Sequence, residues 1–236
     1  MESYKAETAR HYNAYRPPVH GIILKRLLGA EKFVRALDVG CGTGVSSEAL
    51  LAYSENVVGI DPSEDMLSRA GKHERILYRK FDGKVLPFKP SQFDLITFAG
   101  SLNYSEKKSM AHETIRVAAQ GCKVVVYDFA VDMDRVLHKL SLSDIPQLDY
   151  DHDAGFDEFG AQNMSCLDHG QSTEQFDIEP DQLAHLLLSD ERITGRLSSM
   201  GTDSFSYVVK LLHDRVTTGT VKIQARTFSR VYHIRK

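Results

Sequence analysis

Three closely spaced glycines follow an acidic residue in the stretch ALDVGCGTGVSSEAL, residues 36–50. Gly40, Gly42 and Gly44 stand between an apolar run and a helix-like pattern. A glycine-rich turn of this kind lets the backbone approach a ligand at the N-terminus of the following helix. Asp61 ends the next apolar run, where a carboxylate can accept hydrogen bonds from both hydroxyls of a ribose.

The glycine spacing differs from those of two well-known nucleotide loops. A P-loop has the form G-x-x-x-x-G-K-S/T, but Val45 stands at its second glycine position and no lysine follows. The dinucleotide fingerprint G-x-G-x-x-G/A also meets Val45, whose side chain would obstruct the close contact between helix and strand. A nicotinamide oxidoreductase is therefore disfavoured, although Asp61 alone would suit its ribose as well.

A third polar position follows a later apolar run, in FDGKVLPF at residues 81–88. Asp82 could accept a hydrogen bond from an adenine amino group, and the Gly83 backbone could approach the ring. Together with the glycine turn and Asp61, this segment indicates a ligand that contains adenosine.

Alternating strands and helices must position these residues. The sequence predicts strands at residues 33–40, 56–61, 75–82, 93–100 and 122–129, and helices at 45–54, 62–73 (with Pro62 in the first turn) and 105–121. Several of the strands are continuous apolar runs, which is typical of a parallel sheet covered by helices on both faces. Ligands bind such sheets at the carboxyl ends of the strands.

The remaining segments give weaker patterns. The sequence predicts helices at 4–15 and 19–28, a helix at 131–142, an irregular acidic segment at 144–170, a strand at 176–180, helices at 181–189 and 206–216, and a strand or hairpin at 220–236.

Four segments in order, LDVGCGTG, GIDPSEDML, FDGKVLPF and FDLITFAGSLNY, resemble the motifs of class I S-adenosylmethionine-dependent methyltransferases. The small-molecule branch, similar to ubiquinone and menaquinone biosynthesis methyltransferases, matches best over residues 33–130. The resemblance implies methyl transfer from S-adenosyl-L-methionine to a small molecule, with S-adenosyl-L-homocysteine as product. It also implies an α/β fold: a Rossmann-like, doubly wound, seven-stranded sheet of order 3-2-1-4-5-7-6, with strand 7 antiparallel and a cap inserted after strand 5.

The resemblance divides the chain into four parts: an N-terminal helical lid (1–30), a cofactor-binding core (31–130), a substrate cap (131–175) and a C-terminal completion of the sheet (176–236). The positions that it assigns to the cofactor are Asp38, Gly40, Cys41, Gly42 and Gly44 for the loop under the methionine part, Asp61 for the ribose, Pro62, Met66, Asp82 and Gly83 near the adenine, Ala99 and Gly100 beside the methionine amine, and Tyr15 or Arg16 at the carboxylate.

No catalytic residue is predicted. Because the sulfonium already activates the methyl group, the protein chiefly aligns the acceptor and excludes water. Candidates for a base are Tyr104, His11, Tyr12 and His112, but a lid, surface or packing role is favoured over base catalysis for each of them. A protein that binds the cofactor without catalysis is the alternative function.

Specialised branches fit less well. Residues 99–104 lack the Pro-Pro-aromatic motif of enzymes that methylate amino groups of nucleic acids. A magnesium site of the catechol-methyltransferase type would need a carboxylate in this segment in addition to Asp128, and residues 99–104 contain none. The three cysteines do not form the thiol set of an arsenite methyltransferase. The acidic run 149–160 matches four ligand positions of an EF-hand but has Ala154 and Gly160 where that loop needs glycine and glutamate. A solvated acidic cap, or a cap that selects a cationic or polar substrate, is favoured over a calcium site, and no metal is predicted.

The composition and charge of the chain restrict the classes of protein to which it can belong. The chain has 236 residues, a net charge of −3 and a pI near 6.4, which disfavour binding to nucleic acids through a broad basic surface. The three cysteines are widely spaced, the N-terminus is polar, and no apolar run approaches the length of a membrane span. These features predict a cytoplasmic protein without a membrane span and leave the oligomeric state open.

Overall fold

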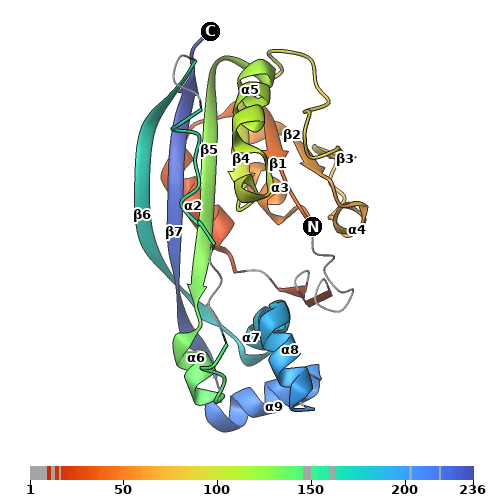
Figure 1. The fold of residues 1–236 in the computed structure, drawn as a ribbon, viewed down its shortest axis with the longest axis vertical. Coiled ribbons are helices and arrows are strands. Elements are labelled where there is room, and N and C mark those ends of the chain that lie inside the picture. The colour runs from red at the N-terminus through yellow and green to blue at the C-terminus, as the bar shows by residue number, and fades with distance from the viewer. Residues whose placement is uncertain are drawn as a thin grey trace. The chain divides into compact units, whose positions relative to one another are not determined.

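The structure is a computed structural model that describes residues 10–11, 14–15, 17–145, 150–159, 163–201, 204–217 and 219–236. In this part of the chain, seven strands form one sheet in the order β3-β2-β1-β4-β5-β7-β6 (Figure 1). The strands are β1 (Phe33–Val39), β2 (Ser54–Asp61), β3 (Ile76–Lys80), β4 (Phe93–Ala99), β5 (Ala118–Asp132), β6 (Met164–Ile178) and β7 (Val221–Ile234).

Helices connect the strands and follow them in the chain. They are α2 (Val19–Leu28), α3 (Val45–Leu50), α4 (Glu64–Leu67), the 3-10 helix η1 (Leu102–Tyr104), α5 (Lys107–Val117), α6 (Asp134–Lys139), α7 (Pro180–Leu188), α8 (Glu191–Ser199) and α9 (Phe205–Arg215). Figure 1 shows α5 in front of β4 and α2 behind β5, so helices cover both faces of the sheet.

The register of the strands brings the predicted ligand residues to one edge of the sheet. β1 pairs in parallel with both β2 and β4, and Asp38 lies opposite Gly59 on one side and Thr97 on the other. β2 pairs in parallel with β3, β4 pairs in parallel with β5, and β7 runs antiparallel to its neighbours (Figure 1). The predicted strand order and the orientation of strand 7 are confirmed.

Burial explains why the central strands are continuous apolar runs. Leu37, Val39, Ile60, Ile96 and Phe98 are almost fully buried and belong to one core cluster. A strand that is covered by helices on both faces has no solvent side to mark with polar residues.

The structure differs from several predicted elements. The predicted helix 62–73 is only the short α4. For the end of the chain, the prediction of one strand is confirmed and the alternative of a hairpin is not, because β7 is continuous. β6 begins at Met164, inside the segment predicted to be irregular, because its many exposed polar residues hide the strand pattern. Helix α8 was not predicted, since it buries only Ile193 and Leu197.

The chain divides into two compact units. The first, called the helical unit, comprises Met1–Pro18, Val131–Tyr150 and Thr173–Ala225, and in it α7 packs against α8 and α9. The second, called the sheet unit, comprises Val19–Ala130, Asp151–Ser172 and Arg226–Lys236. The four predicted domain boundaries stay predictions. Of the helices in the described residues, none has the length and apolar character that a membrane span requires.

Candidate functional site

The turn between β1 and α3 is tied to the end of the neighbouring strand β2. The backbone N–H groups of Gly40 and Cys41 both donate to the carbonyl oxygen of Ile60, at 2.8 and 3.0 Å. Gly44 N–H donates to the Cys41 carbonyl at 2.9 Å, which closes the turn before α3 begins. The glycine motif therefore lies at the carboxyl ends of two adjacent parallel strands, as predicted.

Two of the glycines differ in what surrounds them. Gly40 has a φ of +71°, and a β-carbon on it would lie 2.3 Å from the β-carbon of Ser101. Gly42 has a φ of +54°, and the position of its β-carbon has no protein atom within 4 Å. The turn is thus closed against the segment after β4 at Gly40 and open at Gly42. An open backbone at Gly42 is the kind of cradle that a ligand can approach closely.

Asp61 connects the glycine turn to the start of α4. Its Oδ2 accepts a hydrogen bond from Gly42 N–H at 2.9 Å, and its Oδ1 accepts one from Ser63 N–H at 2.8 Å. Burial raises the pKa of this carboxyl, while the bonds from Ser63 and Gly42 act in the opposite direction. Each carboxylate oxygen offers two lone pairs, so the hydroxyls of a ribose can still be bound beside the backbone donors.

Asp38 lies below the turn and is fully buried. Its Oδ2 accepts hydrogen bonds from Ser46 Oγ at 2.6 Å and Ser47 Oγ at 2.7 Å, and its Oδ1 accepts one from Thr97 Oγ1 at 2.9 Å. Burial raises its pKa, against the effect of these three hydroxyls. The carboxyl joins β1 to α3 and β4, which agrees with the predicted role of orienting the loop.

Cys41 lies inside the turn, and its thiol is unreactive. Its side chain is buried, and burial together with the charges of Asp38 and Asp61 raises the pKa of the thiol far above its ordinary range. A thiol that stays protonated is a poor nucleophile and a poor metal ligand.

The predicted adenine residues follow β2 and β3. Ser63 caps α4 by accepting a hydrogen bond from Met66 N–H at 3.3 Å, which places half-buried Met66 one turn beyond Asp61 and Pro62. Asp82 is exposed, and its Oδ1 accepts bonds from the N–H groups of Val85 and Lys84, which lower its pKa.

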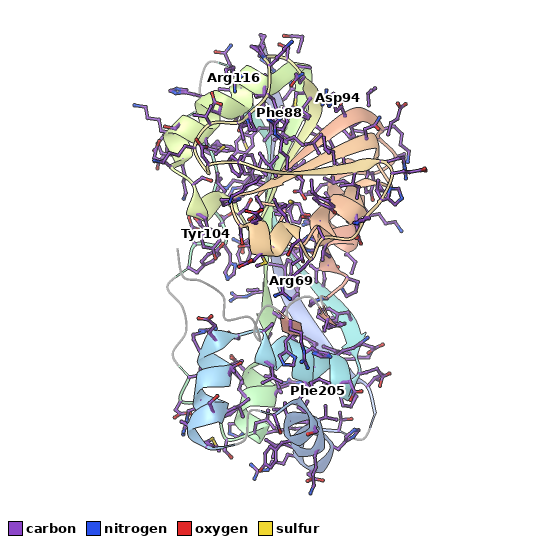
Figure 2. All side chains as sticks on the ribbon, turned by 90° about the vertical axis from the view of Figure 1, so that its right-hand side faces the viewer. Arg69, Phe88, Asp94, Tyr104, Arg116 and Phe205 are labelled. Atoms are coloured by element: carbon purple, nitrogen blue, oxygen red, sulfur yellow. The ribbon has the colours of Figure 1, made fainter. Side chains whose placement is uncertain are left out.

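A clamp on α5, not predicted from the sequence, fixes the loop after Asp82. Glu113 Oε2 accepts a hydrogen bond from Leu86 N–H at 2.8 Å, and Arg116 donates to the carbonyls of Leu86 at 2.8 Å and Phe88 at 2.6 Å. Figure 2 shows Arg116 beside Phe88. The sequence feature that could have predicted this clamp is a glutamate and an arginine three residues apart on one helix, a spacing that places both side chains on the same face.

The end of β4 brings a second acidic group to the same edge. Ala99 pairs with Tyr127, and Gly100 N–H donates to the Tyr127 carbonyl at 2.8 Å. The next residue, Asp128, places its Oδ1 3.0 Å from the position that a β-carbon on Gly100 would take. Asp128 Oδ2 lies 2.9 Å from His152 Nδ1. The sequence analysis did not single out His152, which lies in the acidic segment. It considered Asp128 only for a magnesium site, and that site was disfavoured.

The predicted candidates for a base lie in different places. Tyr104, labelled in Figure 2, has 76% of its surface exposed, and His112 is exposed on α5. His11 belongs to the helical unit, where its Nδ1 lies 2.8 Å from His185 Nδ1 and its ring stacks on Phe205. Burial lowers the pKa of His185. A catalytic role for any of them stays a prediction.

Three predicted residues lie at the N-terminus. Tyr12 and Arg16 are outside the described residues. Tyr15 belongs to the helical unit, and burial raises its pKa. Contact of Tyr15 or Arg16 with a cofactor stays a prediction.

The interpretation of the acidic segment as a solvated face is wrong for part of it. Arg230 of β7 forms ion pairs with Asp153, at 3.1 Å, and with Asp157. Asp151 lies 3.6 Å from Lys107 Nζ. Because the aspartates have cationic partners within the protein, they fasten this segment to β7 and α5. Asp149 and Gly160, the first and last positions of the EF-hand match, are outside the described residues.

Comparisons with known proteins identify relatives of part of the chain. Residues 36–122 match the family model described as a methyltransferase domain. The demethylmenaquinone methyltransferase of Renibacterium salmoninarum is 39% identical over 106 residues, which cover 44% of this chain and 44% of that protein. The ubiquinone biosynthesis O-methyltransferase of Methylococcus capsulatus is 34% identical over 94 residues, 37% of this chain and 40% of that protein. The chain thus matches less than half the length of these curated relatives.

The fold is shared over a larger part of the chain. A solved structure from Anaeromyxobacter dehalogenans, provisionally assigned as a type II methyltransferase, superimposes with a TM-score of 0.68 over 92% of this chain and 96% of that one, at 20% identity. The predicted resemblance to class I methyltransferases is confirmed for the motif-bearing part of the sequence and for the fold.

Proposed function

We propose that this chain is an S-adenosylmethionine-dependent methyltransferase that acts on a small-molecule acceptor. The observation that carries the proposal is the link between the open glycine turn and Asp61, formed by the hydrogen bond from Gly42 N–H to Asp61 Oδ2. This link brings together, at one edge of the sheet, a backbone that a ligand can approach closely and a carboxylate that can bind a ribose. The methyltransferase family match over residues 36–122 includes both.

The residues along this edge fit the parts of the cofactor. Gly42 leaves open space for the methionine part, and Asp61 has lone pairs for the two ribose hydroxyls. Beyond β3, Asp82 presents its carboxylate from an exposed loop, and the β-carbon position on Gly83 has no protein atom within 4 Å. That pair suits the amino group and the flat ring of adenine.

The bound cofactor supplies a methyl group on a positively charged sulfur. The remaining work belongs to the protein: the turn and Asp61 hold the donor in one orientation, and the buried Asp38 network keeps the turn rigid. Holding two reactants in line converts a bimolecular reaction into an effectively unimolecular one, which contributes about 7–11 kcal/mol in favourable systems.

The relatives' names support a class of acceptor. The names of two relatives refer to quinones, demethylmenaquinone and ubiquinone, and these proteins match 44% and 37% of this chain. We therefore propose an aromatic small molecule as acceptor.

Calorimetry with S-adenosylhomocysteine tests the cofactor site. We expect micromolar binding, about −8 kcal/mol, by the parent protein. Asp61→Ala should weaken binding by ~1.5 kcal/mol or more, because charge-assisted hydrogen bonds to the ribose are lost. Asp65→Ala, which removes an exposed acid on α4, is the matched control and should bind like the parent. Equal affinities of the parent and Asp61→Ala would refute the assignment of Asp61.

A protein that binds the cofactor without transferring its methyl group is the alternative. Incubation with a methyl-labelled donor and an extract of small molecules separates the two. Labelled product supports the enzyme, whereas tight binding of S-adenosylhomocysteine without any product supports the silent binder. Binding of NADH in place of S-adenosylhomocysteine would contradict both.

A further inference from the structure

The loop that carries Asp82 is anchored at both of its ends. Before the loop, Phe81 N–H donates to the backbone carbonyl of Asp61 at 3.3 Å, which ties the end of β3 to the end of β2. After the tip of the loop, Leu86 N–H donates to Glu113 Oε2 of α5 at 2.8 Å. The residues between these two anchors are the ones that we expect to meet the adenine ring.

The second anchor is a pair of charged side chains on one face of α5, called here the Glu113–Arg116 clamp. Arg116 Nε donates to Glu113 Oε1 at 2.7 Å, and Arg116 Nη2 donates to Glu113 Oε2 at 2.6 Å. The same guanidinium donates to the carbonyl oxygens of Leu86 at 2.8 Å and Phe88 at 2.6 Å. Two side chains of one helix therefore hold one N–H group and two carbonyl groups of the loop (Figure 2).

The clamp is charged and partly shielded from water. The Glu113 side chain is 18% exposed and that of Arg116 is 32% exposed. A hydrogen bond from Arg116 lowers the pKa of Glu113, and the same bond raises the pKa of Arg116. Hydrogen bonds between ionised groups are shorter and stronger than neutral ones, and the planar fork of an arginine can form several of them in a fixed geometry. The clamp is therefore a rigid support for the loop.

At the tip of the loop, the backbone orients the carboxylate of Asp82. Its Oδ1 accepts bonds from Lys84 N–H at 2.8 Å and Val85 N–H at 2.9 Å. The bonds from Val85 and Lys84 lower the pKa of Asp82, so the group is ionised at neutral pH. An ionised carboxylate only accepts hydrogen bonds. The tip therefore suits a base that presents a donor, such as the 6-amino group of adenine.

We propose that the Glu113–Arg116 clamp makes the cofactor site selective for adenine, because it holds the loop where the Asp82 carboxylate meets the 6-amino group. Glu113 and Arg116 are thus positioning residues that act through Asp82. This inference rests on the proposed function and deepens it, since it assigns the selectivity for the base of the cofactor to two residues of α5.

The exposure of the tip is the reason that it needs such a support. A carboxylate in contact with water gains little from an amino group unless both are held in one geometry, and a loop that is ordered beforehand loses less entropy when the ligand binds. Without the clamp, Asp82 would be held by its own turn alone. The loss should therefore fall on the contact with the amino group, whereas the contacts that we propose for Asp61 and the glycine turn should persist.

Calorimetry with S-adenosylhomocysteine and its 6-deamino analogue, whose purine carries hydrogen in place of the amino group, tests the proposal. The parent should prefer S-adenosylhomocysteine by ~10-fold or more, the factor that corresponds to a hydrogen bond with a charged group. Glu113→Ala and Arg116→Lys should reduce this preference below ~3-fold by weakening the binding of S-adenosylhomocysteine. A lysine keeps the charge, but it lacks the fork that reaches both carbonyls.

Two further variants serve as controls. Glu113→Gln keeps an oxygen that can accept the bond from Leu86 N–H and should have an intermediate preference, above that of Glu113→Ala. Lys108→Ala removes an exposed side chain from the same helix and should behave like the parent. A parent-like preference in both Glu113→Ala and Arg116→Lys would overturn the proposal.

A double-mutant cycle separates positioning from general support of the fold. Asp82→Ala alone should abolish the preference between the two ligands. Adding Glu113→Ala to Asp82→Ala should change the affinity for S-adenosylhomocysteine by less than ~2-fold, because the clamp then has no carboxylate to position. A merely structural role would weaken both ligands in both backgrounds, and such an additive loss would refute the proposal.

Hydrogen exchange in the free parent protein is a measurement that does not depend on how well the variants fold. The Leu86 amide should exchange slowly, because its N–H group is bonded to Glu113 before any ligand arrives. Exchange at the rate of an unprotected loop amide would show that the loop is not ordered beforehand, and this would overturn the proposal.

Failure of the proposed function would look different. In that case the parent would bind neither S-adenosylhomocysteine nor its 6-deamino analogue. If the parent binds both ligands equally well, the cofactor site stands and only the role of the clamp is refuted.

Discussion

At the scale of single residues, the site depends on carboxylates whose environments differ. Asp38 has no exposed surface and satisfies its oxygens with three hydroxyls, whereas Asp82 is exposed and is bonded by backbone N–H groups. Burial raises the pKa of Asp38, and backbone hydrogen bonds lower that of Asp82. The same residue type thus stabilises the framework in one place and offers a charged acceptor in the other.

The raised pKa of Asp38 predicts how stability depends on pH. Between the ordinary aspartate value near 3.9 and the raised native value, the folded protein binds a proton that the unfolded chain has released. Stability from this group is therefore complete below the unfolded pKa and is lost as pH rises through the window. We expect urea unfolding to show the parent losing stability relative to Asp38→Asn as pH rises from about 4. A difference between the two proteins that stays constant with pH would contradict this.

At the scale of elements, the turn between β1 and α3 uses its glycines for two purposes. Gly40 allows the turn to approach Ser101, which follows β4, whereas Gly42 keeps a surface open. The spacing of the motif is therefore a consequence of packing at one position and of access at another. Because both backbones are left-handed, any side chain carries some strain at either position.

Alanine at these two positions should separate stability from binding. Gly40→Ala adds a collision with Ser101 to the backbone strain and should lower the free energy of unfolding by at least about 2 kcal/mol. Gly42→Ala meets no protein atom and should lose about 1 kcal/mol, the backbone strain alone, but its methyl group should weaken the binding of S-adenosylhomocysteine. Denaturant unfolding and calorimetry measure the two effects. Similar stability losses, with unaltered binding by Gly42→Ala, would be inconsistent with an open cradle.

At the scale of the whole molecule, residues far apart in the chain hold the segment that carries His152. Arg230, near the C-terminus, donates through Nε to the Asp153 carbonyl at 3.1 Å and forms ion pairs with Asp153 and Asp157. Tyr232 Oη lies 3.1 Å from Asp157 Oδ2 and accepts the Phe156 N–H bond at 2.8 Å. The last strand therefore positions a residue 78 places earlier in the sequence.

Replacing Arg230 tests this arrangement. The Arg230 side chain is only 18% exposed, so Arg230→Met leaves two aspartates without their cation and should lower the free energy of unfolding by about 2 kcal/mol. Amide exchange in residues 150–159 should accelerate because the segment loses its contacts with Arg230. Arg196→Met, which removes an exposed pair with Asp144, is the control and should change stability by less than about 0.5 kcal/mol. Parent-like exchange in this segment after Arg230→Met would show that other contacts hold it.

The sequence alone determined the parts of this protein that depend on local pattern. Largely apolar runs predicted β1, β2 and β4, because a strand that is buried on both faces is mostly apolar. The glycine turn and Asp61 were predicted because they adjoin those strands, and parallel strands bring their carboxyl ends to one edge. Strand order followed from the resemblance of the motifs.

The tertiary structure decided what depends on contacts between distant residues. β6 is mostly polar and exposed, and its pairing with β7 in the sheet makes it a strand. The Asp128–His152 pair joins residues 24 places apart, and its histidine lies in a segment whose charges suggested a solvated cap or a cap that selects the substrate. Hydrophobic periodicity records which side of an element is buried, but it carries no information about which polar side chains meet across the fold.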